Sequence, residues 1–356
     1  MDMQMDMPGI QPATNTPSTL GIITEYSLNW PGTAKGSTHE LVINDKYIFV
    51  TGQLMNKVAK FDYNGKLIKH LSMPVGSNPH GLLINKKGQL WVSFESFGIV
   101  ARLNQETGVV EEEIDVKLYA QGAAKPINTA PHGIGLDADG ETMWFTGKRT
   151  STLGKINPDR SVEHFELPSL AALPIFVSAG ADGGIWGTEL NTSSILHKSK
   201  DSDLVQEYVI PGVNTRPIAI ISDPDPAAKF MWYTTEAGGK VGKMDMSGNI
   251  IAEFAIPAVQ KNYILASLAF DNDKNLWVQA YVNQANPVPA GNDYIIKFDK
   301  SIRDITNANN MSVASTRYDI PSRMSMMHRI RPDFDGNLWF TEMMTDKLGK
   351  ITLNKK

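Results

Sequence analysis

The stretch of sequence that decides the fold is Leu338-Trp339-Phe340-Thr341-Glu342, in which a tryptophan flanked by apolar residues is followed two positions later by threonine. Aromatic and β-branched residues in a short run of this kind favour a β-strand. The pattern recurs along the chain at intervals of about 40 to 60 residues, a period typical of propeller blades. The seven copies contain the leading aromatics Phe49, Trp91, Trp144, Trp186, Trp232, Trp277 and Trp339.

Each copy belongs to a set of short strand-forming segments separated by turns. A turn such as Asp335-Gly336 precedes the tryptophan segment, which is a hairpin signal. A third segment such as residues 348–351 (LGKI) follows it. A fourth, such as residues 207–211 (EYVIP), closes with a proline, which an outer edge strand tolerates. These segments predict a four-stranded blade for each copy, without long helices.

The two ends of the chain are expected to meet in one blade. The seventh copy stops directly after its third strand, whereas residues 22–28 (IITEYSL) match the fourth-strand pattern and follow no blade. Pairing these segments closes the ring and removes exposed sheet edges. We therefore predict an all-β, seven-bladed β-propeller of four-stranded blades, with a flexible N-terminal lead over residues 1–19 and a single domain over residues 20–356.

Composition narrows the classes of function. The chain has 356 residues, a net charge of −4 and no cysteine. The weak negative charge gives no basis for nucleic-acid binding, and the lack of cysteine excludes disulfides and thiolate chemistry. No apolar run has the length of a membrane span, and the N-terminus lacks the pattern of a signal peptide. We expect a soluble monomer whose partner is a small molecule, and the compartment remains open.

Four of the seven histidines occupy one position of the repeat, 10 to 12 residues before the leading aromatic. They are His39, His80, His132 and His328. At the start of the innermost strand of a blade they would face the central channel together. Imidazole titrates near neutral pH and therefore suits acid/base catalysis. Two other interpretations remain open, namely structural capping of the strands and ligation of iron or zinc.

Further residues are candidates for substrate binding. Blades four, five and six carry Phe176, Ile218 and Ala266 at about the histidine position, so one side of the channel would be apolar and suit an organic ligand with one polar end. The other candidates lie beside His328, near strand ends or at the rim: Met326, Glu189, Glu236, Arg216 and Trp30. Glu189 and Glu342 follow their blade tryptophan by three residues, whereas Glu236 follows by four. Because side chains alternate along a strand, we expect Glu236 to point to the opposite side from Glu189 and Glu342.

The repeated Trp-Phe-Thr-Glu and Leu-Gly-Lys-Ile-Thr segments, with Pro-His-Gly-Ile opening the innermost strand, resemble the virginiamycin B lyase (streptogramin B lyase) family over roughly residues 22 to 354. The resemblance implies a seven-bladed propeller that eliminates across an ester C–O bond of a cyclic depsipeptide. It assigns His328 as general base and Glu342 as one of two glutamates that hold magnesium. The second glutamate falls on Met326, and a thioether is a poor magnesium ligand. We therefore expect no cofactor, since a magnesium ion would keep only Glu342 of the pair.

We expect an enzyme of specialised metabolism that binds a hydrophobic, oxygen-bearing small molecule in the channel and makes or breaks a C–O bond. His328 would be the principal acid/base, and His39, His80 and His132 would orient the substrate or stabilise developing charge. Two reactions stay open: a lyase-type elimination, and a cofactor-free cyclisation of the hetero-Diels–Alder type that relies on holding two partners in contact. The alternatives are a non-catalytic propeller that binds a partner and a histidine-ligated metalloenzyme.

Overall fold

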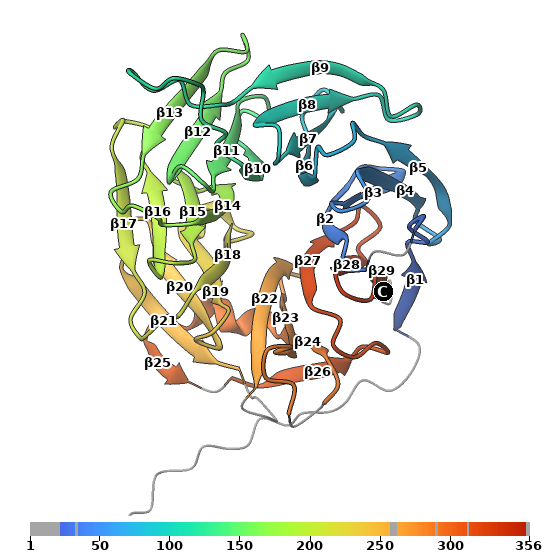
Figure 1. Ribbon diagram of the computed structural model, residues 1–356. Coiled ribbons are helices and arrows are strands. Elements are labelled where there is room, and N and C mark those ends of the chain that lie inside the picture. Colours follow the sequence, from blue (N-terminus) through green and yellow to red (C-terminus); the bar gives the residue numbers. More distant parts are fainter. Residues whose placement is uncertain (1–21, 33–34, 257–261, 289–290, 312, 354–356) are drawn as a thin grey trace, which may run out of the picture.

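A computed structural model describes residues 22–32, 35–256, 262–288, 291–311 and 313–353, so the expected lead over residues 1–19 lies outside the described residues. The described chain forms seven antiparallel sheets arranged as a ring around a common axis (Figure 1). In each sheet the strands follow one another from the axis outward. The all-β, seven-bladed propeller predicted from the repeat is therefore confirmed. No helix among the described residues is long and apolar enough to cross a membrane.

The strands occupy equivalent places in the seven blades. The innermost strands are β2 (Thr38–Ile43), β6 (Pro79–Ile84), β10 (Pro131–Leu136), β14 (Pro174–Ala179), β18 (Pro217–Ser222), β22 (Tyr263–Phe270) and β27 (Met327–Pro332). The second strands are β3 (Tyr47–Gly52), β7 (Leu90–Phe94), β11 (Met143–Gly147), β15 (Ile185–Glu189), β19 (Phe230–Thr235), β23 (Leu276–Val282) and β28 (Leu338–Glu342). The third strands are β4 (Lys57–Asp62), β8 (Ile99–Leu103), β12 (Thr152–Ile156), β16 (Ser194–Lys198), β20 (Lys240–Asp245), β24 (Tyr294–Phe298) and β29 (Lys347–Ile351). The fourth strands are β5 (Leu67–Ser72), β9 (Val110–Asp115), β13 (Val162–Glu166), β17 (Val205–Val209), β21 (Ile250–Ala255), β26 (Ser315–Asp319) and β1 (Ile23–Ser27).

The N-terminal strand closes the ring as predicted. Strand β1 pairs antiparallel with β29, with Ile23 opposite Ile351 and Ser27 opposite Lys347. One strand was not predicted: β25 (Ala308–Met311) adds to the outer edge of blade five, parallel to β21. It comes from the connection between β24 and β26, which also contains a short 3-10 helix over Lys300–Asp304. A second 3-10 helix spans Pro226–Ala228, so helices are confined to single turns in the described residues.

In five of the seven blades, as far as the described residues show, a tryptophan anchors its strand to the preceding turn. The indole of Trp339 is completely buried and donates a hydrogen bond of 2.8 Å to Asp333, in the turn before its strand. Trp232 and Trp277 make the same bond to Asp223 and Asp271. A buried indole N–H requires such a partner. The motif therefore fastens the second strand of a blade to the turn that precedes it.

The threonine of the motif fastens one blade to the next. Thr341 donates a hydrogen bond of 2.6 Å to the carbonyl of His39, and Thr51 donates one of 2.9 Å to the carbonyl of His80. Ser93 reaches the carbonyl of His132 over 3.3 Å. These bonds hold the backbone of three repeat histidines in place. The sequence pattern that defines the blades thus also positions the side chains at the axis.

The candidate active site at one mouth of the propeller

The four repeat histidines gather into one cluster at the axis. Every blade is entered at the same end of its innermost strand, and each histidine is the first or second residue of its strand element. The ring centroid of His80 lies 5.1 Å from His39, 3.7 Å from His132 and 5.7 Å from His328. His39 and His328 are 5.2 Å apart. These distances place the four imidazole rings next to one another.

Three of the imidazoles are held through the same ring nitrogen. Their Nδ1 atoms contact backbone carbonyls: His39 the carbonyl of Ser37 at 2.9 Å, His80 that of His132 at 3.1 Å, and His132 that of Ile175 at 3.0 Å. A carbonyl oxygen accepts only, so Nδ1 carries the proton and Nε2 keeps its lone pair. The Nε2 of His80 is buried without a partner among the described residues. These rings can therefore accept a proton or a hydrogen bond from a ligand.

Burial keeps the three rings neutral. Desolvation, and next the neighbouring His328, lower the pKa of His39 to about 4. Desolvation, and next the proximity of the His132 ring, hold the pKa of His80 well below its usual value. Desolvation, and then the nearby Lys148 ammonium, act on the pKa of His132 in the same direction. Near neutral pH these imidazoles are bases without charge.

His328 has a different partner. Its Nε2 lies 3.1 Å from Oε1 of Glu40, a close contact whose angle falls outside ordinary hydrogen-bond geometry. Glu40 is completely enclosed and is also held by the guanidinium of Arg329, with Arg329 Nε 2.6 Å from Glu40 Oε2. The Arg329 charge and the contact with His328 hold the Glu40 pKa well below its usual value, despite the opposing effect of burial. The Glu40 carboxylate is therefore ionised and lies beside the His328 ring.

Glu40 and Glu95 are functional candidates that the sequence prediction of the site omitted. Glu95 accepts hydrogen bonds of 2.8 Å from Gln53 and from Lys148. Its ligating atom lies within 4.8 Å of those of His80 and His132, and the same holds for Glu40 with His80 and His328. The signal for Glu40 was available, because it is a charge inside the apolar strand segment THELVI. Either set has donors that suit a transition metal, although Arg329 already neutralises Glu40.

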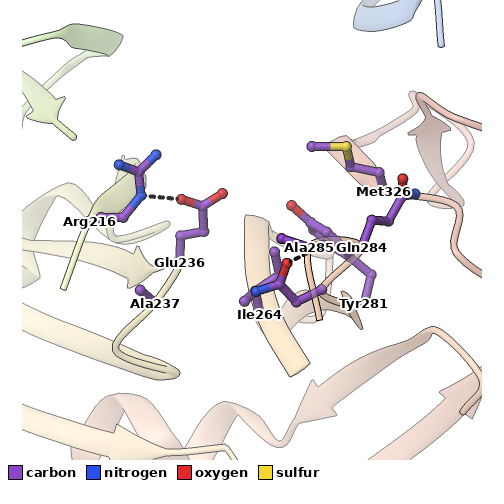
Figure 2. A pocket seen from close by; sticks show the side chains of 9 residues that line it. Arg216, Glu236, Ala237, Ile264, Tyr281, Gln284, Ala285 and Met326 are labelled. Carbon is purple, nitrogen blue, oxygen red and sulfur yellow. Dashed lines mark hydrogen bonds and ion pairs between the residues drawn. The ribbon is translucent and has the colours of Figure 1, made fainter. Parts of the chain in front are cut away.

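A pocket of about 350 Å³ (Figure 2) is lined by residues near the first residues of the innermost strands of blades five to seven, and none of the four cluster histidines is part of its lining. Its lining includes three of the residues predicted to bind substrate, namely Arg216, Glu236 and Met326. Arg216 Nε donates to Glu236 over 2.7 Å on one side of the pocket, and the Met326 thioether lies on the other. Tyr281 and Ile264 add apolar surface. The pocket therefore combines an ion pair with soft apolar walls. Its lining residue Met326 lies two residues before His328 in the chain.

Two candidates lie elsewhere. Phe176 stands one residue beyond the histidine level, because the Nδ1 of His132 reaches the carbonyl of Ile175, as His80 reaches that of His132. Pro174 and Ile175 take the places that Pro131 and His132 have in blade three, so Phe176 lies one residue after the histidine position. Trp30 stacks on the ring of His70 with 5.1 Å between centroids, and His70 belongs to the outer strand β5. Trp30 lines a separate pocket between blades seven and one.

Glu342 and Glu189 turn away from the cluster into their own blades. Glu342 Oε2 accepts a hydrogen bond from Thr345, and Glu189 accepts one of 2.6 Å from Thr192. Strand alternation sends Glu342 to the opposite blade face from Thr341, toward Glu25 on the outer strand β1. With a thioether at Met326 and Glu342 committed to Thr345, the residues do not fit the magnesium site that the family resemblance implies.

These buried groups predict a stability maximum near pH 6.5. Unfolding lets the three cluster histidines take up protons, so acid below their ordinary pKa of 6.5 destabilises the fold. Burial raises the pKa of Glu189 and of Glu342 to about 8 from 4.5, so stability is lost as the pH rises toward 8. Between pH 4.5 and 6.5 the three histidines raise the stability with pH by more than the two glutamates lower it. Above pH 6.5, of these five groups, only the glutamates change the stability.

Urea unfolding of Glu189→Gln measures this effect, since the variant removes one raised pKa and leaves the cluster histidines unchanged. We expect it to be more stable than wild type by about 4 kcal/mol at pH 8 and by less than about 1 kcal/mol at pH 5. An identical pH profile for the two proteins would contradict the assignment of Glu189.

Comparisons with known proteins agree with this fold and family. The model of the virginiamycin B lyase family matches residues 113–290. The virginiamycin B lyase of Nocardia farcinica (strain IFM 10152) is 28% identical over 135 residues, which span 38% of this chain and 42% of that protein.

Solved structures resemble the whole ring. A streptogramin B lyase has a TM-score of 0.74 at 22% identity, covering 93% of this chain and 97% of its own. A catalytically inactive histidine-to-alanine variant of the Staphylococcus aureus virginiamycin B lyase, solved with quinupristin, has a TM-score of 0.72 at 23% identity, covering 93% of this chain and all of its own. Hydrazine synthase of Kuenenia stuttgartiensis has a TM-score of 0.69 at 15% identity and covers 91% of this chain and 97% of its own. At these identities the structures establish the fold alone, whereas the family model shows that this chain belongs to the virginiamycin B lyase family.

Proposed function

We propose that this protein is a metal-independent lyase that acts on a C–O bond of a hydrophobic small molecule at the histidine mouth. The observation that carries the proposal is the cluster of neutral imidazoles whose Nδ1 atoms are tied to backbone carbonyls, which leaves Nε2 atoms free as bases. The pocket beside the cluster has apolar walls and one ion pair. A platform for a protein partner needs neither feature, so the non-catalytic alternative is less well supported.

The contacts of His328 suit the central role in such an elimination. With Nε2 directed at Glu40, its Nδ1 is the basic nitrogen, and the ionised Glu40 stabilises the imidazolium that forms when a proton is taken. In the elimination His328 takes a proton from the carbon next to the one that carries the oxygen. The C–H electron pair becomes the C=C bond, and the C–O pair leaves on oxygen. The ion pair Arg216–Glu236 is placed to meet the polar end of the substrate.

The virginiamycin B lyases among the relatives make quinupristin the first probe. Elimination opens its ring without a change in mass, so the product is detected by a shift in chromatographic retention at constant mass. We expect ring opening that persists in EDTA. Loss of the reaction in EDTA would contradict the metal-independent mechanism and would return the two donor sets at Glu40 and Glu95 to consideration as metal ligands.

A cofactor-free cyclisation is the second candidate, and Met326 is the observation that favours it. A thioether in place of a magnesium ligand is compatible with a pocket that only holds two reactive partners together. Proximity of this kind can supply on the order of 7 kcal/mol. Binding of quinupristin without ring opening would favour this reaction over elimination.

A further inference from the structure

A second cavity lies at the opposite mouth of the channel. It has a volume of about 260 Å³ and is lined by the later residues of innermost strands, whereas the histidines stand at the beginning of theirs. No residue lines both this cavity and the pocket beside the histidines. Its walls are largely aliphatic, with Leu83, Ile134 and Val177 from three successive blades. This far cavity is therefore a separate space with its own chemistry.

A layer of side chains in mid-channel stands between the two spaces. Arg329 is bound to Glu40 and donates a hydrogen bond of 3.1 Å to the hydroxyl of Ser267. The guanidinium carbon of Arg329 lies 4.3 Å from the ring centroid of Phe176. Phe176 is nearly fully buried and forms part of the far cavity wall. The ion pair and the aromatic ring thus separate the pocket near the histidines from the far cavity.

Arg331 is the one charged group among the described residues that line the far cavity. Its Nε donates a hydrogen bond of 2.9 Å to the carbonyl of Leu41. Among the described residues no carboxylate lies within ion-pair distance of Arg331, in contrast to Arg329 two residues earlier. Burial, and next the positive charge of Arg329, lower the pKa of Arg331 to about 10. A cation with this little compensation in an apolar cavity favours an anionic ligand.

We propose that the far cavity is a binding site for a small organic carboxylate with an apolar body, held by the guanidinium of Arg331. The planar guanidinium matches the two oxygens of a carboxylate, which makes two parallel hydrogen bonds. The aliphatic walls receive the rest of the ligand. The volume lies just below the range of roughly 300–1,000 Å³ that drug-sized ligands need, so the ligand is of the size of benzoate or a branched short-chain acid.

The proposal is independent of the chemistry at the histidine mouth, and calorimetry with benzoate tests it on the full protein. Benzyl alcohol is the neutral ligand of similar shape, and inorganic phosphate is the anion without an apolar body. We expect benzoate to bind with one site per chain. Its binding should be at least about 10-fold tighter than that of benzyl alcohol or of phosphate, since a hydrogen bond to a charged group contributes about 1.5–3 kcal/mol. Phosphate binding as tight as benzoate would overturn the proposal, because the walls would then have no part.

Two variants separate the guanidinium from the walls. Arg331→Met removes the charge at similar length and is expected to weaken benzoate binding about 10-fold or more. Ala179→Leu keeps Arg331 and fills the cavity, so it should weaken benzoate and leave phosphate unchanged. The second variant decides the question if the first fails to fold. Benzoate affinity equal to wild type in either folded variant would overturn the site, and quinupristin turnover tests the histidine mouth separately.

Discussion

Replacing His328 by alanine should lower kcat/KM for a C–O substrate such as quinupristin by about 100-fold or more, because general acid/base catalysis contributes on the order of 10²–10⁴. The His328 side chain is 23% exposed, whereas its partner Glu40 is 5% exposed, so a ligand in the mouth can reach the ring. The fold should survive, because the His328 side chain makes none of the hydrogen bonds that anchor the blades. The tryptophan–aspartate and threonine–carbonyl bonds remain in the variant.

The matched control is His164→Ala. His164 lies on the outer strand β13, where its ring packs edge-on against Phe145 with 5.8 Å between centroids. We expect wild-type kcat/KM in this variant, with both proteins compared by near-ultraviolet circular dichroism. A wild-type rate in His328→Ala would remove His328 from the mechanism. An equal loss in both variants would indicate damage to the fold instead.

Removing the carboxylate of Glu40 should have the largest effect on stability. Glu40→Ala leaves the guanidinium of Arg329 buried without its partner, and breaking a buried pair in this way costs about 3–5 kcal/mol. Both side chains of the pair are less than one-tenth exposed, at 8% and 5%. Urea unfolding at pH 6.5 measures the change. The variant Glu40→Met with Arg329→Met should recover most of the loss, since no unpaired charge is then left in the layer.

An exposed pair provides the control for Glu40→Ala. Lys155 and Glu163 lie 3.3 Å apart on the outer part of blade three, with side chains 29% and 47% exposed. Glu163→Ala should change the free energy of unfolding by less than about 1 kcal/mol, because solvent screens such pairs. A Glu40→Ala effect as small as that of Glu163→Ala would mean that water reaches the layer of Arg329 and Glu40. This layer would then not seal the channel.

The fold could be predicted from the sequence because one motif is repeated at a regular interval. Trp339 and Thr341 make bonds to an aspartate and to a neighbouring blade that recur in other copies, so the repeat records real contacts. Strand β25 could not be predicted, since it belongs to a connection and pairs parallel with another blade. Its sequence has no relation to the repeat.

The site was predictable only where it followed the repeat. The histidine cluster could be predicted because equivalent positions in neighbouring blades meet at the axis. Glu40 was missed because one residue separates the histidine level from the layer that it shares with Arg329. Phe176 was placed only about at the histidine position, because the spacing to the leading aromatic varies from 10 to 12 residues between blades. Glu342 was predicted from the family resemblance, and its hydrogen bond to Thr345 cannot be inferred from the sequence.

The central claim is that His39, His80 and His132 are neutral bases with the proton on Nδ1. Nitrogen-15 NMR of the imidazole rings at pH 6 tests it most directly, because the two nitrogens of a neutral ring have distinct shifts and those of an imidazolium are alike. We expect three rings in the neutral Nδ1–H form at pH 6, with His39 taking up a proton only near its pKa of about 4. Rings that are protonated at pH 6, or that carry the proton on Nε2, would contradict the account.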